Sequence, residues 1–304
     1  MEILATIPPP HHQTEAARIA NHPYIDAARF NTGARSRLSP YHTLLLLQNI
    51  LSDKPLWVDL KGRQLRITRW ADLEFDHITL SHAITVDLPA QIILRNGTGE
   101  GIEIPITAVR GRHVYVDNTD LRRLIVGNGQ SANIRGKNLK VDGYLTNQDK
   151  AYIEAANELG INRFMLSFVE QDSDITELTD LAPDSHIILK IESERGLNFI
   201  ENFDRVNHGA ASLHYMAARD DLFVNSKSPD EVIEATRFIL ERDRRAVVAS
   251  RILTSLIRNV NPSLGDIADL TLLKEAGCSR IMLCDDLCSS DAFEDAMDCL
   301  KKVV

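Results

Sequence analysis

Short apolar runs alternate with amphipathic segments along most of the chain. Residues 187–189 form an apolar run too short for a helix, which indicates a buried strand. Residues 229–242 follow a serine and begin with a proline and two acidic residues, which predicts a helix. Outside a central stretch, the pattern predicts eight strands, each followed by a helix, with the strands at 2–7, 24–31, 56–62, 163–167, 187–192, 212–219, 246–250 and 280–283. This order is typical of an α/β protein with a (β/α)8 TIM barrel, whose active sites lie where the strands end.

The central stretch, residues 67–139, has a different pattern. Helical periodicity disappears, and alternating runs at 83–86, 91–94 and 113–116 are separated by turns such as 127–129. The sequence therefore predicts a small inserted β domain at 67–139, after the third strand. Residues 1–66 and 140–304 then form the two parts of the barrel.

Charged side chains lie two residues apart where the fifth strand ends, at Lys190 and Glu192. Residues two apart on a strand face the same side, and an unpaired buried charge is costly. The pair is therefore either a structural ion pair or part of a functional site. The same spacing recurs where other strands end, at Arg29 with Asn31, Asp59 with Lys61 and Arg219 with Asp221, and the seventh strand ends in Ser250. One such pair could be a solvated rim, but convergence of several favours a site.

The residue types at these ends suit an anionic 2-oxo acid or its enol phosphate. Glu192 and Asp221 offer hard oxygen ligands of the kind that Mg²⁺ or Mn²⁺ binds. Lys190 and Arg29 can stabilise the negative charge of a phosphoryl group or an enolate. Ser250 can donate a hydrogen bond or relay a proton to the enol carbon.

Composition limits the classes of partner. The chain has 304 residues and a formal net charge of −9 at pH 7, and it has no basic cluster, so nucleic-acid binding is not expected. No apolar run is long enough to span a bilayer, and the N-terminus has no signal-peptide pattern. The four cysteines lie near the C-terminus and are interpreted as reduced thiols. These features predict a cytoplasmic protein without a membrane partner.

Several segments together resemble the pyruvate kinase family, in the phosphoenolpyruvate/pyruvate barrel superfamily. Residues 187–192, Ile-Ile-Leu-Lys-Ile-Glu, are similar to the Lys-Ile-Glu strand of that family. The other similar segments follow in the family's order and are residues 27–31 (Ala-Ala-Arg-Phe-Asn), 58–66 (Val-Asp-Leu-Lys-Gly-Arg-Gln-Leu-Arg), 216–222 (Met-Ala-Ala-Arg-Asp-Asp-Leu), 248–251 (Val-Ala-Ser-Arg) and 277–283 (Gly-Cys-Ser-Arg-Ile-Met-Leu). The β insert falls where the family has its lid domain.

The resemblance implies a role for each matching residue. Glu192 and Asp221 match the divalent-metal ligands, Lys190 matches the lysine that faces the transferred phosphoryl group, and Arg29 matches an arginine on that group. Ser250 stands where the family has a threonine near the enolpyruvate methylene. The remaining candidates are Asn31 and Asp59 for a monovalent cation, Lys61 and Arg66 for nucleotide or phosphate, and Asp220 as a substrate neighbour.

Departures from the family pattern affect three expectations. Asp220 and Phe223 replace glycines of a turn, and a carboxylate there is expected to repel an anionic substrate. Leu60 replaces a threonine, which removes an oxygen ligand and argues against a potassium requirement. Cys284-Asp285-Asp286 replaces Ser-Gly-Glu, and these changes taken together argue against nucleotide binding as well as a potassium requirement. The chain ends where the barrel ends, so effector control by the family's C-terminal domain is not expected.

Three functions are compatible with these residues. The first is pyruvate kinase-like phosphoryl transfer between phosphoenolpyruvate and a nucleotide such as ADP or ATP, through a metal-stabilised enolate. The second is an aldolase or lyase that forms or breaks a carbon–carbon bond beside a pyruvate enolate. The third is a non-catalytic binding or regulatory protein. Barrel enzymes often associate, so a homo-oligomer is also among the expectations.

Overall fold

The computed structural model describes residues 1–34, 36–51, 53–69, 77–95, 101–116, 127–205, 210–225 and 228–303. The chain forms two compact units. The first comprises Met1–Leu60 and Asn147–Val304, and the second comprises Lys61–Thr146. The second unit is thus longer at both ends than the predicted insert, residues 67–139.

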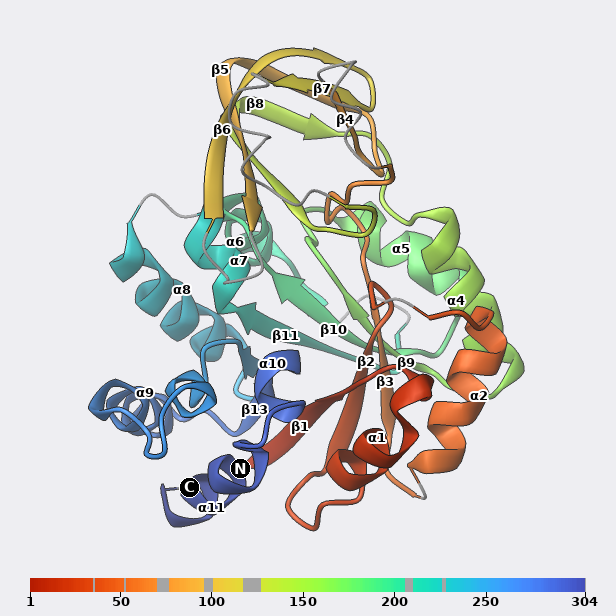
Figure 1. Ribbon diagram of the computed structural model, residues 1–304. Coiled ribbons are helices and arrows are strands. Elements are labelled where there is room, and N and C mark those ends of the chain that lie inside the picture. Colours follow the sequence, from red (N-terminus) through yellow and green to blue (C-terminus); the bar gives the residue numbers. More distant parts are fainter. Residues whose placement is uncertain are drawn as a thin grey trace. The chain divides into compact units, whose positions relative to one another are not determined.

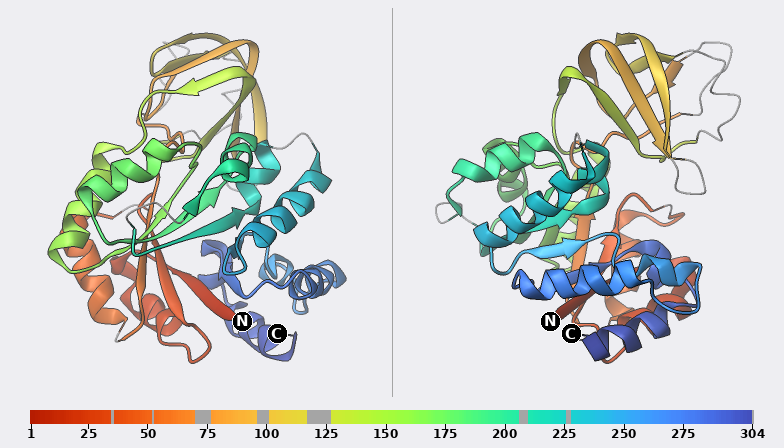
Figure 2. Two further views of the ribbon diagram at one scale, coloured as in Figure 1. Left: turned by 180° about the vertical axis from the view of Figure 1, so that it is seen from behind. Right: turned by 90° about the vertical axis from the view of Figure 1, so that its left-hand side faces the viewer.

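The first unit is a closed barrel of eight parallel strands in the order β1-β13-β12-β11-β10-β9-β3-β2. The predicted (β/α)8 barrel is therefore confirmed. The strands are β1 Glu2–Ile7, β2 Ala27–Asn31, β3 Leu56–Leu60, β9 Arg163–Leu166, β10 His186–Ile191, β11 Ser212–Ala218, β12 Val247–Ala249 and β13 Arg280–Leu283. Figures 1 and 2 show the longer helices outside this barrel.

Helices connect the strands, as the alternating pattern predicts. They are η1 Pro10–His12, α1 Gln13–Ala20, α2 Pro40–Ile50, α4 Asn147–Glu158, α5 Asp172–Leu181, α6 Glu194–Asn202, α7 Arg219–Asn225, α8 Pro229–Arg242, η3 Thr254–Ile257, α9 Leu264–Glu275, α10 Asp285–Cys288 and α11 Phe293–Val303. Ser39 caps α2, since its hydroxyl accepts a hydrogen bond from the His42 N–H. Gln171 is the N-cap of α5, where it forms a capping box with Asp174.

Alternation along the strands explains how the barrel interior is divided. Its apolar layer consists of Leu4, Ala27, Trp57, Met165, Ile188, Met216, Ala218, Val247, Ala249 and Met282. Side chains two residues further along a strand face the same side. The next interior positions on β1, β2, β3 and β10, and directly after β9, are therefore all buried and polar. They are Thr6, Arg29, Asp59, Lys190 and Ser167. On these five strands the sequence thus places a polar layer directly above an apolar one, at the carboxyl ends of the strands.

The second unit is a five-stranded antiparallel sheet in the order β4-β7-β6-β5-β8. Its strands are β4 His77–Thr79, β5 Ile84–Arg95, β6 Gly101–Arg110, β7 His113–Val116 and β8 Ala132–Val141. The two runs predicted at 83–86 and 91–94 belong to one long strand, β5. The sheet has a core of its own, formed mainly by Ile and Leu side chains such as Ile92, Leu94 and Ile104.

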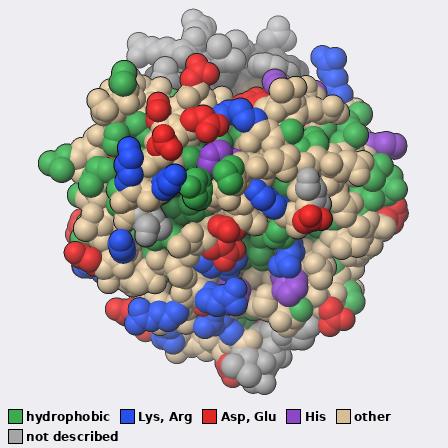
Figure 3. All heavy atoms as spheres, turned by 90° about the horizontal axis from the view of Figure 1, so that it is seen from below, with side chains coloured by type: hydrophobic (Ala, Val, Ile, Leu, Met, Phe, Trp, Pro, Cys, Tyr) green, Lys and Arg blue, Asp and Glu red, His purple; other side chains and the backbone are tan. Residues whose placement is uncertain are grey.

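Two surface properties bear on partners. Over most of the face seen from below, Lys and Arg side chains lie among Asp and Glu side chains (Figure 3). Within the described ranges, no helix is both long enough and apolar enough to cross a bilayer.

Candidate active site

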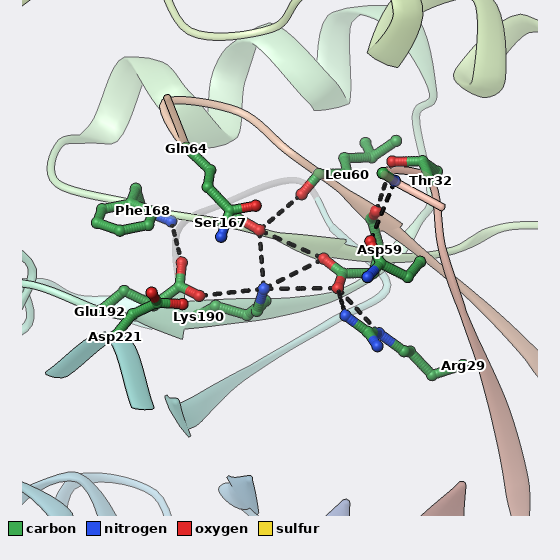
Figure 4. A network of polar contacts seen from close by, with 12 residues as sticks. Arg29, Thr32, Asp59, Leu60, Gln64, Ser167, Phe168, Lys190, Glu192 and Asp221 are labelled. Atoms are coloured by element: carbon green, nitrogen blue, oxygen red, sulfur yellow. Dashed lines mark hydrogen bonds and ion pairs between the residues drawn. The ribbon is translucent and has the colours of Figure 1, made fainter. Parts of the chain in front are cut away.

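The centre of the candidate site is the ammonium group of Lys190, which is buried in the polar layer of the barrel. Its Nζ donates hydrogen bonds to Ser167 Oγ at 2.8 Å and to Asp59 Oδ1 at 3.3 Å. It also lies 3.1 Å from Glu192 Oε1, outside hydrogen-bond geometry. Burial alone lowers the pKa of Lys190, but Asp59 and Glu192 outweigh that effect, and the net direction is upward. Lys190 is therefore a charged, fixed group (Figure 4).

Glu192 follows β10 and is as deeply buried as Lys190. Its Oε2 accepts a hydrogen bond of 2.7 Å from the backbone N–H of Phe168, whereas its Oε1 has no hydrogen-bond partner among the residues described. Burial, with repulsion from Asp221 and Asp59, raises the pKa of Glu192 to about 7, against the lowering effect of Lys190. A buried carboxylate oxygen with only an ion pair still has capacity for a further cationic partner.

The segment Ser167-Phe168 after β9 positions both of these groups. The hydroxyl of Ser167 accepts from Lys190 and donates to the carbonyl of Leu60 at 2.8 Å. Phe168 has φ of 52°, a left-handed conformation that costs a non-glycine residue roughly 1–2 kcal/mol. This conformation accompanies the hydrogen bond from its N–H to Glu192. The prediction from sequence missed both residues. Ser167 is the last residue of the predicted strand 163–167, so the search for polar residues at strand ends could have found it.

Arg29 is surrounded by hydrogen-bond acceptors. Its Nε donates to Asp59 Oδ2 at 2.9 Å, Nη2 contacts the same oxygen, and Nη1 donates to Thr6 Oγ1 at 3.1 Å and Asp285 Oδ1 at 2.5 Å. Asp59 and Asp285 raise its pKa despite burial, which by itself lowers it. Asn31 donates to the other oxygen of Asp285 at 3.1 Å. Two carboxylates therefore already neutralise the guanidinium predicted to bind a phosphoryl group.

Asp221 and Asp220 lie in the first turn of α7. Figure 4 shows Asp221 beside Glu192, in line with its effect on the pKa of Glu192. The expectation that Asp220 repels an anionic substrate assumes that nothing compensates its charge. Its Oδ1 accepts a hydrogen bond of 2.7 Å from Arg251 Nε, which corrects that premise. No pattern in the sequence indicates this pairing, because the two residues follow different strands.

Ser250 follows β12 in an unusual backbone conformation. Ser250, Arg251 and Leu253 all have positive φ, at 69°, 60° and 53°. The carbonyl of Ser250 accepts two hydrogen bonds from Arg219, which also pairs with Asp269 at 2.6 Å. The two-residue spacing predicts that Arg219 faces the site together with Asp221. That prediction is wrong, because Arg219 instead holds the Ser250 turn.

The charges of the site suit a divalent cation. When all six groups are ionised, Arg29 and Lys190 carry two positive charges and four carboxylates carry four negative ones, which leaves −2. The carboxylates are Asp59, Glu192, Asp221 and Asp285. No cluster of three or more His, Cys, Asp or Glu side chains with metal-binding geometry exists among the described residues. Glu192 and Asp221 nevertheless fit Mg²⁺ or Mn²⁺, which take only one or two carboxylates and complete their shell with water and substrate.

The two remaining candidates belong to the second unit. Lys61 is the first residue of that unit and is buried. Arg66 donates from Nη1 to the carbonyl of Gly129 at 2.6 Å and from Nη2 to Gln64 Oε1 at 2.8 Å. Part of the hydrogen-bonding capacity of Arg66 is therefore used within its own unit.

Comparison with known proteins identifies the family of this chain. A family model described as "Pyruvate kinase, barrel domain" matches residues 102–291. The chain belongs to the pyruvate kinase family. It is 25% identical to a pyruvate kinase of Thermoplasma acidophilum over 99% of this chain and 57% of that protein. It is 23% identical to a pyruvate kinase of Borreliella burgdorferi, over 93% of this chain and 63% of that protein. The chain thus spans about three fifths of the length of these relatives.

Proposed function

We propose that this protein is a divalent-metal-dependent enzyme that acts on phosphoenolpyruvate or pyruvate, with phosphoryl transfer to or from a nucleotide. The observation that carries the proposal is the buried Lys190 ammonium beside the carboxylate pair of Glu192 and Asp221. Burying these charges is costly unless they act on a ligand or on one another. The family supports the kinase-like class of the reaction.

Each residue has a defined task in this mechanism. Glu192 and Asp221 would hold Mg²⁺ or Mn²⁺, which supplies Lewis-acid stabilisation of charged oxygens when bound. Lys190, fixed by Ser167 and Asp59, directs its positive charge at the oxygen that gains negative charge during transfer. Ser250 relays a proton to or from the enol carbon. The assignment of Lys61 and Arg66 to nucleotide or phosphate remains a prediction from the sequence.

A second candidate is an aldolase or lyase that uses the same enolate. The contact between Arg29 and Asp285 favours it, because a phosphoryl group at Arg29 must compete with a carboxylate already 2.5 Å from Nη1. Carbon–carbon bond chemistry beside an enolate needs Lys190 and the metal ligands but does not need Arg29 as a phosphate-binding group. The expected lack of a potassium requirement, a homo-oligomer and a cytoplasmic location remain predictions from the sequence.

Proton NMR of pyruvate in D₂O tests the proposal. Wild-type protein with Mg²⁺ or Mn²⁺ is expected to exchange the methyl protons for deuterium, and Glu192→Gln is expected to abolish the exchange. Glu158→Gln, an exposed position on α4, is the matched control. Mn²⁺ affinity, measured by EPR, should fall in Glu192→Gln and stay unchanged in the control.

The conditions for exchange separate the candidate reactions. Exchange that needs ATP or phosphate supports phosphoryl transfer, which should also appear as pyruvate formation from phosphoenolpyruvate and ADP. Exchange with metal alone supports the lyase. Absence of both activities, with Mn²⁺ bound or not, would contradict the proposed enzyme and favour a binding protein.

A further inference from the structure

Arg251 is a charged residue that the mechanism above does not use. It follows β12, whereas Asp220 and Phe223 lie in α7, directly after the neighbouring strand β11. Both segments lie at the carboxyl ends of their strands, the end of the barrel where the candidate site is located. Asp220 is next in sequence to the proposed metal ligand Asp221. Arg251 therefore borders the candidate active site.

Three features hold Arg251 in place. Its Nε donates a 2.7 Å hydrogen bond to Asp220 Oδ1, and its guanidinium lies over the ring of Phe223, 4.1 Å from the ring centroid. The turn that presents it is anchored by Arg219, which binds the carbonyl of Ser250. Left-handed conformations at non-glycine residues are disfavoured, and where they persist they often mark a functional site.

The guanidinium keeps hydrogen-bonding capacity after these contacts. Across the residues that the structure describes, neither Nη atom of Arg251 donates a hydrogen bond, and its side chain is 47% exposed. An arginine fixed in this manner can bind a planar anion with two parallel hydrogen bonds, at a smaller loss of side-chain entropy than a free one. Asp220 already supplies one negative charge nearby, which disfavours a dianionic phosphate and leaves a singly charged carboxylate as the better ligand.

We propose that Arg251 determines substrate specificity by binding a second carboxylate, so that the preferred substrate is a 2-oxo acid with a further carboxylate at its distal end. The inference rests on the proposed function, because it assumes that the site forms an enolate from a 2-oxo acid. It changes one part of that proposal, since a longer 2-oxo acid takes the place of pyruvate as the preferred substrate. It also assigns a joint role to Asp220, Phe223 and Arg251. Asp220 and Phe223, which replace glycines of the family pattern, orient Arg251.

Deuterium exchange at C3 of two acids of equal chain length tests this inference. These acids are 2-oxoglutarate, which has a distal carboxylate, and 2-oxopentanoate, which lacks it. The wild type is expected to have a lower KM for 2-oxoglutarate. Arg251→Gln should raise that KM on the order of tenfold to a hundredfold, the range of a charge-assisted hydrogen-bonded pair. The same variant should change the KM for 2-oxopentanoate by less than about twofold, because that acid makes no such pair.

Further variants separate orientation from charge. Phe223→Leu keeps an apolar side chain but removes the ring, so the KM for 2-oxoglutarate should rise by a smaller factor than in Arg251→Gln. Arg251→Lys keeps the positive charge but loses the two parallel donors of the guanidinium, so its KM for 2-oxoglutarate should lie between those of the wild type and Arg251→Gln. Arg237→Gln, at an exposed position of α8, is the control for a general loss of positive charge.

The outcomes distinguish this inference from the function on which it rests. Exchange of pyruvate without preference for 2-oxoglutarate, or an equal effect of Arg251→Gln on both acids, would overturn the role of Arg251 alone. Absence of exchange with every acid, pyruvate included, would overturn the proposed function and this inference with it.

Discussion

Asp59→Asn perturbs the charge balance inside the barrel without changing the size of the side chain. Four charged residues are almost completely buried there: Arg29, Lys190, Asp59 and Glu192, at 7%, 5%, 0% and 1% exposure. Their charges sum to zero when all four are ionised. Among these four groups the variant leaves one positive charge in excess, and Asp59 is the residue that contacts both cations. A buried charge that loses its partner costs roughly 3–5 kcal/mol.

Thermal unfolding followed by circular dichroism measures this loss. At roughly 2–4 °C per kcal/mol for a domain of this size, Tm should fall by about 10 °C. Asp180→Asn, at an exposed position on α5, should change the free energy of unfolding by less than about 0.5 kcal/mol. The double variant Asp59→Asn with Lys190→Met removes one charge of each sign. It should therefore lose about 1–3 kcal/mol less than the sum of the two single variants.

Two results would refute the reasoning. A loss below about 1 kcal/mol in Asp59→Asn would show that the buried cations do not depend on this carboxylate. Additive losses in the double variant would show that the charge of Lys190 is not coupled to that of Asp59.

Three further predictions concern other positions. Ser167→Ala should lower kcat by about tenfold and leave KM within about twofold, because the serine holds Lys190 at 2.8 Å and the lysine loses its orientation without it. Ser167→Thr should restore part of the rate. Equal changes in kcat and KM would indicate a structural role. Asp285→Asn removes a charge from Arg29, so the affinity for phosphoenolpyruvate should rise several-fold, and an unchanged Kd in isothermal titration calorimetry would contradict competition at this guanidinium. Burial alone would raise the pKa of Asp243, but hydrogen bonds from His214, two backbone N–H groups and an arginine hold it well below its usual value. The contribution of this carboxylate to the free energy of unfolding is therefore complete above about pH 4, and it is lost as pH falls through the lowered folded-state pKa. Asp243→Asn should cost about 2 kcal/mol at pH 7, measured by urea unfolding, and progressively less in acid.

Alternation along single strands was enough to predict much of the site. Because side chains two apart share a face, the sequence alone assigns the charges at 29, 59 and 190 to one side of their strands. The barrel then follows from eight strand–helix repeats, and the barrel implies that these strand ends meet. This reasoning failed at Arg219, because the residue begins a helix and its side chain bonds to Asp269 and the Ser250 carbonyl instead.

The partners of these charges could not be predicted in the same way. Asp285 binds Arg29 across 256 positions in sequence, and Arg251 neutralises Asp220 across 31. No pattern in the sequence predicts either contact. The strand ends that carry these residues come together because β13 pairs with β1 and β11 pairs with β12. The backbone N–H of Phe168 is a still clearer case, because a main-chain donor leaves no trace in residue identity.

The sequence by itself therefore determined the strands, the apolar and polar layers of the barrel and the identity of the charged groups. Those properties depend on local periodicity and on the cost of burying charge. Only the tertiary structure decided which carboxylate neutralises which cation, and so which groups remain available to a ligand. That choice depends on distances across strands, which arise when the barrel closes.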